Sequence, residues 1–358
     1  MATPELRVMQ LNAWLIPVRP NFPKCLDFHA FGRAKRLAKW IEAEAVAKRL
    51  DVCILQEVWT PWRSVVAGLI HSAFCCQLFG RSLVENALKS VLPYMSKVEG
   101  SYPCDCTKRF FDSGLMIASK FPIIEQTFQM YPPGSPHDAL SSKGVLVAAL
   151  KRPDSTILIV ASSHLDAGDD DEVKLSQLRI ALGVIREFVR KIANKFSVPI
   201  SAVLFGADMN IDGVEFWRSD TFYGTARQLM EADGFVDSWL LTDRPVAASA
   251  PYGPDSHPEL GITSDQHNCV KRLDYLWTKQ GGAPVQEMMG KKNLTGHAHL
   301  SEGAHWRSSV PMRAAVAAAH ASGDVPLATQ LAEEMDIRDR TERLSDHAAL
   351  YVTLKLPH

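Results

Sequence analysis

The feature that most constrains this chain is a series of short apolar segments, several of which end at a polar side chain. Residues Leu6–Asn12 alternate apolar and polar side chains as a strand does, and Asp51–Leu55 has the continuous apolar pattern of a buried strand. Further strands are expected at Gly114–Ser119, Ile123–Met130, Gly144–Leu150, Ile157–Ser163, Val198–Phe205, Arg272–Thr278 and Ala348–Leu356. Several of these strands follow one another without an intervening helix, unlike the regular alternation of a parallel doubly wound sheet.

Helical periodicity appears between some of the strands. Residues Phe31–Leu50 and Glu172–Lys195 carry apolar side chains at helical spacing, and Trp62–His71 and Ser82–Leu92 are shorter candidates, the second ended by Pro93. The combination predicts an α/β fold in which two mixed β-sheets pack together and helices cover the outside.

The domain organisation follows from the length and from one region of unusual composition. The 358 residues allow two domains or one large α/β domain. Residues 281–343 are rich in Gly, Ala, His and Ser, with an Ala-rich stretch and a charged helix candidate. We therefore expect a single domain over 1–358 with an insertion at 281–343, between the last two core strands.

Charge and hydropathy exclude several classes of protein. The 39 Lys and Arg residues balance 40 Asp and Glu residues, whereas proteins that bind many phosphates of a nucleic acid leave a basic footprint. No apolar run reaches the roughly 18–20 residues of a membrane span, and the first residues lack a basic region followed by an apolar core. We expect a cytoplasmic protein, with no nucleic acid and no obligate protein partner.

Polar side chains that can bind metals stand where strands end, which is where α/β folds place ligands. The members of this set are Asn12, Glu57, His164, Asp208, Asn210, Asp274, Asp346 and His347.

Each of these residues also has a purely structural explanation. Asn12 is a common turn residue, Glu57 can cap the turn after its strand, and a single His164 is typically a hydrogen-bonded core residue. The run Asp208-x-Asn210-x-Asp212-Gly213 is similar to a calcium loop, but Ser219 stands where that loop needs glutamate and a strand precedes it. The functional interpretation depends on the ordered set.

That order is typical of a known superfamily. The chain resembles the endonuclease/exonuclease/phosphatase (DNase-I-like) superfamily from Arg7 to Leu354, with residues 281–343 interrupting the likeness. The motifs that carry the resemblance are Asn12 in LNAW, Glu57 in LQEVW, Ser113-Gly114 in SGLMIASKFPI, His164 in SSHLDA, Asp208 and Asn210 in GADMN, Asp274 in RLDYLW and Asp346-His347 in SDH. The resemblance implies a four-layer α/β/β/α sandwich with a divalent cation at the strand ends.

The resemblance also implies a role for each site residue. Glu57 and Asn12 would bind Mg²⁺, for which Mn²⁺ can substitute, because Mg²⁺ prefers oxygen ligands and neutralises charge developing on a phosphate. Asp346 would be a further metal ligand or a local brace. His347 would be the general base and Asp274 would orient it. Asp208 and Asn210 would position the water and the phosphoryl oxygens. His164 would donate a hydrogen bond to a phosphoryl oxygen or to the leaving group.

Within the superfamily the chain is most similar to the neutral sphingomyelinases. The similarity lies in LNAWLIP around Asn12, in SSKGVL around Lys143 and in His164-Leu165-Asp166-Ala167. In that branch Lys143 would face the phosphate with Asp138 as a partner, although a solvated loop lysine explains it equally well. His164 stands where an abasic-site endonuclease carries tyrosine, and the segment before Asp274 lacks the pattern of inositol 5-phosphatases.

The expected activity is therefore Mg²⁺-dependent hydrolysis of sphingomyelin, or a related phospholipid, to ceramide and phosphocholine at a membrane surface. A choline head group would favour an aromatic wall, for which Trp14, Trp59, Trp62 and Tyr131 are candidates. Candidates for membrane contact are the loops at Pro93–Tyr102 and Tyr131–Pro136 and part of 281–343. A nuclease or an inositol-phosphate phosphatase of the same superfamily, and a non-catalytic binding module, are the alternatives.

Overall fold

The computed structural model describes most of the predicted core. The described residues are 5–15, 28–59, 80–100, 111–136, 138–214, 219–241, 271–280, 296–300 and 349–355, together with residues 264, 318, 322, 326 and 347. Asp346, the helix expected at Trp62–His71 and most of 281–343 lie outside them.

Helices and strands alternate irregularly along the chain. Their bounds are β1 (Glu5–Asn12), α1 (Phe28–Ala47), β2 (Val52–Gln56), α2 (Gly80–Leu88), β3 (Tyr94–Met95), β4 (Met116–Ser119), β5 (Ile123–Met130), the 3₁₀ helix η3 (Asp138–Leu140), β6 (Gly144–Lys151), β7 (Ile157–His164), α3 (Asp171–Phe196), β8 (Ile200–Asp208), α4 (Phe222–Ala232), β9 (Val236–Asp237), the 3₁₀ helix η4 (Ser238–Leu241), β10 (Asp274–Gln280), β11 (Gly296–Leu300) and β12 (Leu350–Lys355).

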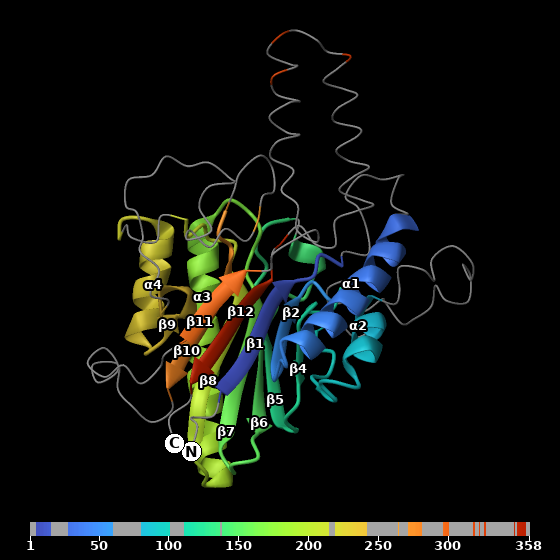
Figure 1. Ribbon diagram of the computed structural model, residues 1–358. Helices are drawn as coiled ribbons and strands as arrows, with labels where there is room; N and C mark the ends of the chain where they lie inside the picture. Colours follow the sequence, from blue (N-terminus) through green and yellow to red (C-terminus); the bar gives the residue numbers. More distant parts are fainter. Residues whose placement is uncertain are drawn as a thin grey trace.

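The strands form two six-stranded mixed sheets (Figure 1). The order in the first sheet is β11-β12-β1-β2-β4-β3, and in the second it is β5-β6-β7-β8-β10-β9. In each sheet one pair is parallel, β1 with β2 and β7 with β8, and the other neighbours are antiparallel. The carboxyl ends of these four parallel strands lie at the end of the sandwich where β10 and β12 begin.

Three clusters of buried apolar side chains lie between the four layers of the fold. One cluster joins α1 and α2 to the first sheet, a second joins α3 and α4 to the other sheet, and the third fills the space between the sheets. In Figure 1 the helix pairs accordingly cover opposite outer faces. The expected α/β/β/α sandwich is confirmed.

The alternation of side chains along the strands explains why polar residues gather at one end of the space between the two sheets. In β1 the side chains facing the second sheet change from Leu6 and Val8 to Gln10 and Asn12. Three other strands show the same change, with apolar residues giving way to Gln56 in β2, to Ser162 and His164 in β7, and to Asp208 in β8. The inner faces are thus apolar at one end and polar at the other.

Most expected elements are present, with small shifts at their ends. The expected helix Ser82–Leu92 is α2, which ends at Leu88, and β8 begins two residues later than predicted. Helix α4 and the strand β11 were not predicted, although Thr221 caps α4 with a 3.0 Å bond from Gly224 N. Strand β11 lies within 281–343 and pairs with β12, so that part of the segment belongs to the first sheet. The single domain with an insertion stays a prediction.

Candidate active site

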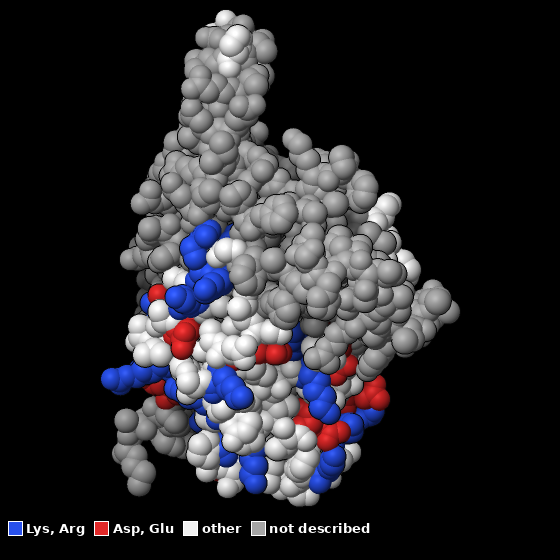
Figure 2. Space-filling model, turned by 90° about the vertical axis from the view of Figure 1, so that its right-hand side faces the viewer, with Lys and Arg blue, Asp and Glu red and all other residues white. Residues whose placement is uncertain are grey.

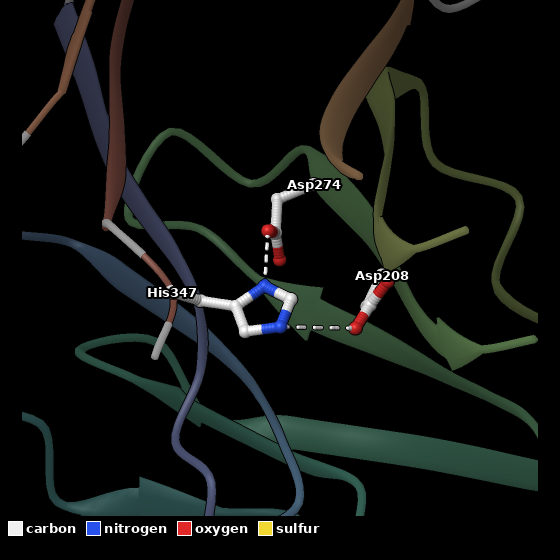
Figure 3. Close-up of side chains that lie close together, drawn as sticks. All are labelled: Asp208, Asp274 and His347. Atoms are coloured by element: carbon white, nitrogen blue, oxygen red, sulfur yellow. Dashed lines mark hydrogen bonds and ion pairs between the residues drawn. The ribbon is translucent and has the colours of Figure 1, made fainter. Parts of the chain in front are cut away.

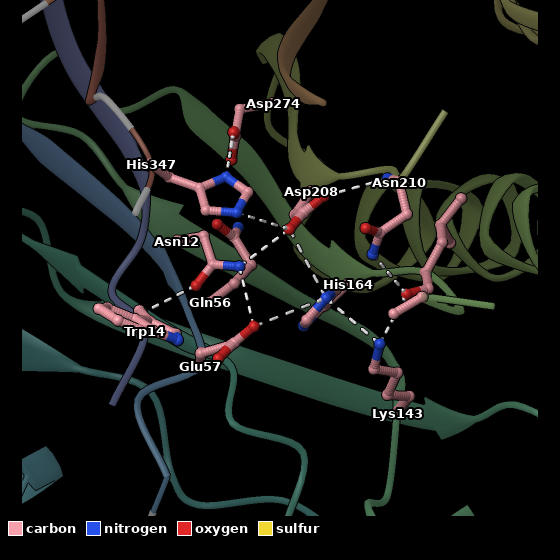
Figure 4. A network of polar contacts seen from close by, with 12 residues as sticks. Asn12, Trp14, Gln56, Glu57, Lys143, His164, Asp208, Asn210, Asp274 and His347 are labelled. Atoms are coloured by element: carbon pink, nitrogen blue, oxygen red, sulfur yellow. Dashed lines mark hydrogen bonds and ion pairs between the residues drawn. The ribbon is translucent and has the colours of Figure 1, made fainter. Parts of the chain in front are cut away.

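Asn12, at the end of β1, connects the two sheets. Its Nδ2 atom donates to Glu57 Oε1 at 3.0 Å and to Asp208 Oδ2 at 2.8 Å, while its Oδ1 accepts from Trp14 N at 3.0 Å (Figure 4). Glu57 follows β2 in the first sheet and Asp208 ends β8 in the second. One amide therefore brings together two buried carboxylates from different sheets.

A left-handed backbone conformation directs Glu57 into the site. Continued strand alternation after Gln56 would place the next side chain on the helix-covered side of the sheet. Instead Glu57 has φ +54°, a conformation that is uncommon for a residue other than glycine and is typical of functional sites. The turn is held by hydrogen bonds from Leu15 N to Glu57 O and from Val58 N to Gly114 O.

Asp274 and His347 form a second pair facing Asp208 (Figure 3). The Nδ1 atom of His347 lies 2.6 Å from Asp274 Oδ2, and its Nε2 lies 3.8 Å from Asp208 Oδ2. All three side chains are buried. Because the aspartate accepts the Nδ1 proton, the lone pair of a neutral imidazole is on Nε2 and is directed toward the carboxylates.

His164, at the end of β7, faces the same centre. Its Nε2 is 3.6 Å from Asp208 Oδ2, 3.9 Å from Glu57 Oε1 and 3.2 Å from the Lys143 Nζ atom. Burial, reinforced by the positive charge of Lys143, lowers the pKa of His164 to about 3. An ammonium group only donates, so Nε2 is the acceptor and the ring proton lies on Nδ1, which is buried and has no partner among the described residues.

Lys143 is buried and contacts three protein acceptors. Besides His164 it contacts Leu165 O at 2.8 Å and Asp138 Oδ2 at 2.7 Å, and it is 3% exposed. The expected pairing with Asp138 is therefore present, and the solvated loop lysine is excluded. That Lys143 faces the phosphate stays a prediction.

Asn210 lies beside Asp208 in a tight turn. Its backbone nitrogen donates to Asp208 Oδ1 at 3.0 Å, its Nδ2 donates to Leu165 O at 3.1 Å, and its φ is +50°. The structure thus brings Asp208 together with six other residues of the expected set, and only Asp346 of that set lies outside the described residues.

The donor chemistry of the site suits a hard cation. Ligand atoms of Asp208, Asp274 and His347 lie within 4.8 Å of one another, and Asn12 brings Glu57 beside them. Buried carboxylates repel one another unless a positive charge compensates them, and carboxylate and amide oxygens are the ligands that Mg²⁺ prefers.

Sequence reasoning did not find the residues that support the site. Gln10 and Gln56 lie beneath it between the sheets, and their polar side chains on the inner face of apolar strands were the available signal. At the start of β10 a fully buried ion pair joins Arg272 to Asp237 at 2.5 Å. No pattern in the sequence marks that pair.

The fold and the site define the chain as a DNase-I-like α/β sandwich. A family model described as the Endonuclease/Exonuclease/phosphatase family matches residues 9–347, and the chain belongs to this family. It is 27% identical to a sphingomyelinase C of Bacillus cereus over 274 residues, which are 73% of this chain and 76% of the relative. The family and this relative support a phosphodiesterase of the hydrolase class.

Solved structures agree on the fold. SmcL superposes with a TM-score of 0.55 at 15% identity, over 98% of this chain and 99% of SmcL. A beta toxin variant from Staphylococcus aureus, whose structure contains bound magnesium ions, has a TM-score of 0.51 at 16% identity over 98% and 99% of the two chains. Among the described helices, none is both long and apolar enough to cross a membrane.

Proposed function

We propose that the chain is a Mg²⁺-dependent phosphodiesterase that hydrolyses sphingomyelin, or a related phospholipid, to ceramide and phosphocholine. The observation that carries the proposal is the Asp274–His347 pair, whose Nε2 faces Asp208 beside the Asn12–Glu57 pair. A base with its orienting carboxylate next to a group of metal-compatible oxygens suits attack of water on phosphorus. Similarity to the Bacillus cereus sphingomyelinase C supports the choice of substrate.

Glu57 and Asn12 would hold Mg²⁺, with Asp346 as a further ligand. When bound, the ion supplies positive charge that stabilises the charge developing on the phosphoryl oxygens. Asn12 keeps Glu57 and Asp208 in place through its two Nδ2 hydrogen bonds. Mn²⁺ can replace Mg²⁺ in such an oxygen-ligand site.

His347 accepts a proton from the attacking water through Nε2. Asp274 stabilises the imidazolium that results, because its carboxylate lies 2.6 Å from Nδ1. Asp208 and Asn210 orient the water and the phosphoryl oxygens. The new bond joins the water oxygen to phosphorus, and the bond from phosphorus to the ceramide oxygen breaks. The leaving oxygen takes up a proton from solvent, to which His347 returns the proton it removed from the water, so ceramide leaves as a neutral alcohol.

His164 acts as a neutral hydrogen-bond donor to a phosphoryl oxygen or to the leaving group. Its lowered pKa excludes an imidazolium at neutral pH, so it donates through the proton on Nδ1. Lys143 supports this role because its contact with Nε2 selects that tautomer. Its positive charge, partly compensated by Asp138, also favours a phosphate nearby.

The balance of 39 Lys and Arg residues against 40 Asp and Glu residues favours a zwitterionic lipid over a nucleic acid. On the described part of the face in Figure 2, basic and acidic side chains are interspersed among many uncharged residues. A nucleic acid would need a continuous basic surface, whereas a phosphocholine head group carries no net charge. Of the aromatic candidates for a choline contact, Tyr131 packs in the core beneath α3, and Trp14 already contacts the guanidinium of Arg33 at 4.4 Å.

The loop after β5 is our candidate for membrane contact. Met130 is 37% exposed, and Pro132, Pro133 and Pro136 are exposed beside it. Asp166 fixes this loop by accepting hydrogen bonds from the nitrogen and the hydroxyl of Ser135. An apolar loop that is held rigid near Lys143 would place the site at the lipid surface.

A substrate panel tests the proposal. The purified chain is assayed with Mg²⁺, and again with EDTA, on sphingomyelin vesicles, a lysophospholipid, duplex DNA and an inositol polyphosphate. We expect release of phosphocholine from sphingomyelin that stops with EDTA. Cleavage of DNA or of the inositol phosphate alone would support the corresponding alternative, and no cleavage at all would favour a binding module.

Glu57→Gln tests the metal ligand within that panel. Since a bound ion contributes several kcal/mol to the transition state, turnover is expected to fall on the order of 100-fold or more. Glu125→Gln is the matched control, because Glu125 forms ion pairs with Lys191 and Lys195 on the surface. Unchanged turnover of Glu57→Gln at limiting Mg²⁺ would remove Glu57 from the metal site.

A further inference from the structure

A polar layer crosses the space between the two sheets directly beneath the site. Gln10 in β1 has 0% exposure and follows Leu6 and Val8 on the inner face of its strand. Gln56 in β2 is equally buried. Two long amides therefore continue inner faces that are apolar earlier along the same strands.

The hydrogen bonds of this layer run from the second sheet through both amides to Asp274. Gln56 Nε2 contacts Ser162 Oγ at 3.2 Å and Gly206 O at 3.4 Å. Its Oε1 accepts from Gln10 Nε2 at 2.8 Å, and the same Gln10 nitrogen donates to Asp274 Oδ1 at 2.9 Å. The other oxygen of Asp274 lies 2.6 Å from His347 Nδ1.

The direction of these hydrogen bonds fixes the orientation of the Gln10 side-chain amide. Gln10 contacts the carboxylate with its nitrogen, because a carboxylate only accepts. As a result Gln10 Oε1 is buried and has no hydrogen-bond partner among the described residues. An unsatisfied buried acceptor disfavours folding, and an apolar side chain at this position would avoid it. Stability alone therefore does not explain a glutamine here.

We propose that Gln10 is a positioning residue for the general base, which it aligns by holding Asp274. The inference rests on the proposed function, since it assigns Gln10 a part in the reaction of the Asp274–His347 pair. Gln10 fixes one carboxylate oxygen, so the other keeps its direction toward His347 Nδ1. Without that donor the carboxylate rotates more freely, and Nε2 of His347 loses its alignment with the attacking water.

The test compares Gln10→Met with Gln56→Met. Both variants remove one buried amide, but only the first removes the donor to Asp274. For Gln10→Met we expect kcat to fall on the order of 10–100-fold, as for residues that orient catalytic ligands, with KM within about twofold of the wild type. For Gln56→Met we expect a smaller loss of kcat and a comparable decrease in Tm. Gln10→Leu, which also lacks the donor and carries no charge, replaces Gln10→Met if that variant does not fold.

A double variant separates positioning from general destabilisation. If Gln10 acts through Asp274, kcat of Gln10→Met/Asp274→Asn equals that of Asp274→Asn alone, and urea unfolding of the metal-free proteins shows the same non-additivity. Equal losses of kcat for Gln10→Met and Gln56→Met, or additive effects with Asp274→Asn, would overturn the inference.

All ratios of kcat are measured on two substrates, sphingomyelin and bis(p-nitrophenyl) phosphate. A wild type that cleaves only the second refutes the proposed substrate and still tests Gln10.

Discussion

The ammonium of Lys143 contacts the imidazole of His164 at 3.2 Å, and both residues are less than 5% exposed. Two cations at this distance in a buried site repel each other strongly, so the imidazole stays neutral. The contact therefore disfavours protonation of His164 in the folded chain but not in the unfolded chain.

Stability of the metal-free protein is expected to depend on pH through His164. The unfolded histidine binds a proton below its ordinary pKa of 6.5, whereas the pKa of the folded form is lowered to about 3. Between these values the unfolded state binds more protons, so the contribution of this group to stability rises with pH by up to about 1.4 kcal/mol per pH unit. The contribution of His164 to stability is constant below pH 3 and above pH 6.5.

Urea unfolding of the wild type and of His164→Gln from pH 4 to pH 8 measures this contribution. The free energy of unfolding of the wild type should fall relative to the variant as the pH decreases through 6 and 5. A difference that stays the same at every pH would contradict the lowered pKa.

Lys143→Met is expected to raise the pKa of His164. Burial is the larger cause of the lowered pKa and remains in the variant, so the new value should still lie below 6.5. NMR titration of the His164 ring nitrogens measures the change. Lys174→Met is the control, because Lys174 is also buried but pairs with Asp171 on α3. An unchanged pKa in Lys143→Met would mean that burial acts alone.

The strand ends and the ordered site residues were predictable from the sequence, because both follow from local patterns. Alternation of side chains located β1 and a short apolar segment located β7, and the residues at their ends, Asn12 and His164, are the ones that converge. The fold followed from strands without intervening helices and from the resemblance to a family. None of these signals requires knowledge of a distant contact.

The rest depends on contacts and conformations that leave little trace in the sequence. Gln10 and Asp274 are 264 positions apart, and no local pattern connects them. The positive φ of Glu57 reverses the direction that strand alternation predicts. Strand β11 has the sequence GHAHL, which lacks the β-branched and aromatic residues typical of strands. Its strand conformation depends on pairing with β12.

His347→Ala is expected to lower kcat on the order of 10²–10⁴-fold, the usual contribution of a general base. Asp274→Asn should also slow the reaction, because an amide cannot stabilise the imidazolium as a carboxylate does. Steady-state kinetics with circular dichroism of each variant separates loss of catalysis from loss of fold. A decrease smaller than tenfold for a folded His347→Ala would mean that another group takes the proton.

Arg272→Met is expected to destabilise the chain by about 3–5 kcal/mol, because it leaves the carboxylate of Asp237 buried without its cation. Asp237 is fully buried, and it also accepts hydrogen bonds from Tyr223 Oη at 2.7 Å and Trp239 N at 3.0 Å, which do not replace the positive charge. Thermal and urea unfolding measure the loss. Arg227→Met is the control, since Arg227 forms a half-exposed pair with Glu231 that should contribute less than about 1 kcal/mol.

The second variant Arg272→Met/Asp237→Leu separates the charge from the packing. Removal of both charges should restore part of the stability, because the cost in the single variant is the unpaired buried carboxylate. Arg272 also stacks on Tyr275 at 4.6 Å, so the restoration is expected to be incomplete. A double variant no more stable than Arg272→Met would show that stacking, rather than the ion pair, holds the start of β10 and with it Asp274.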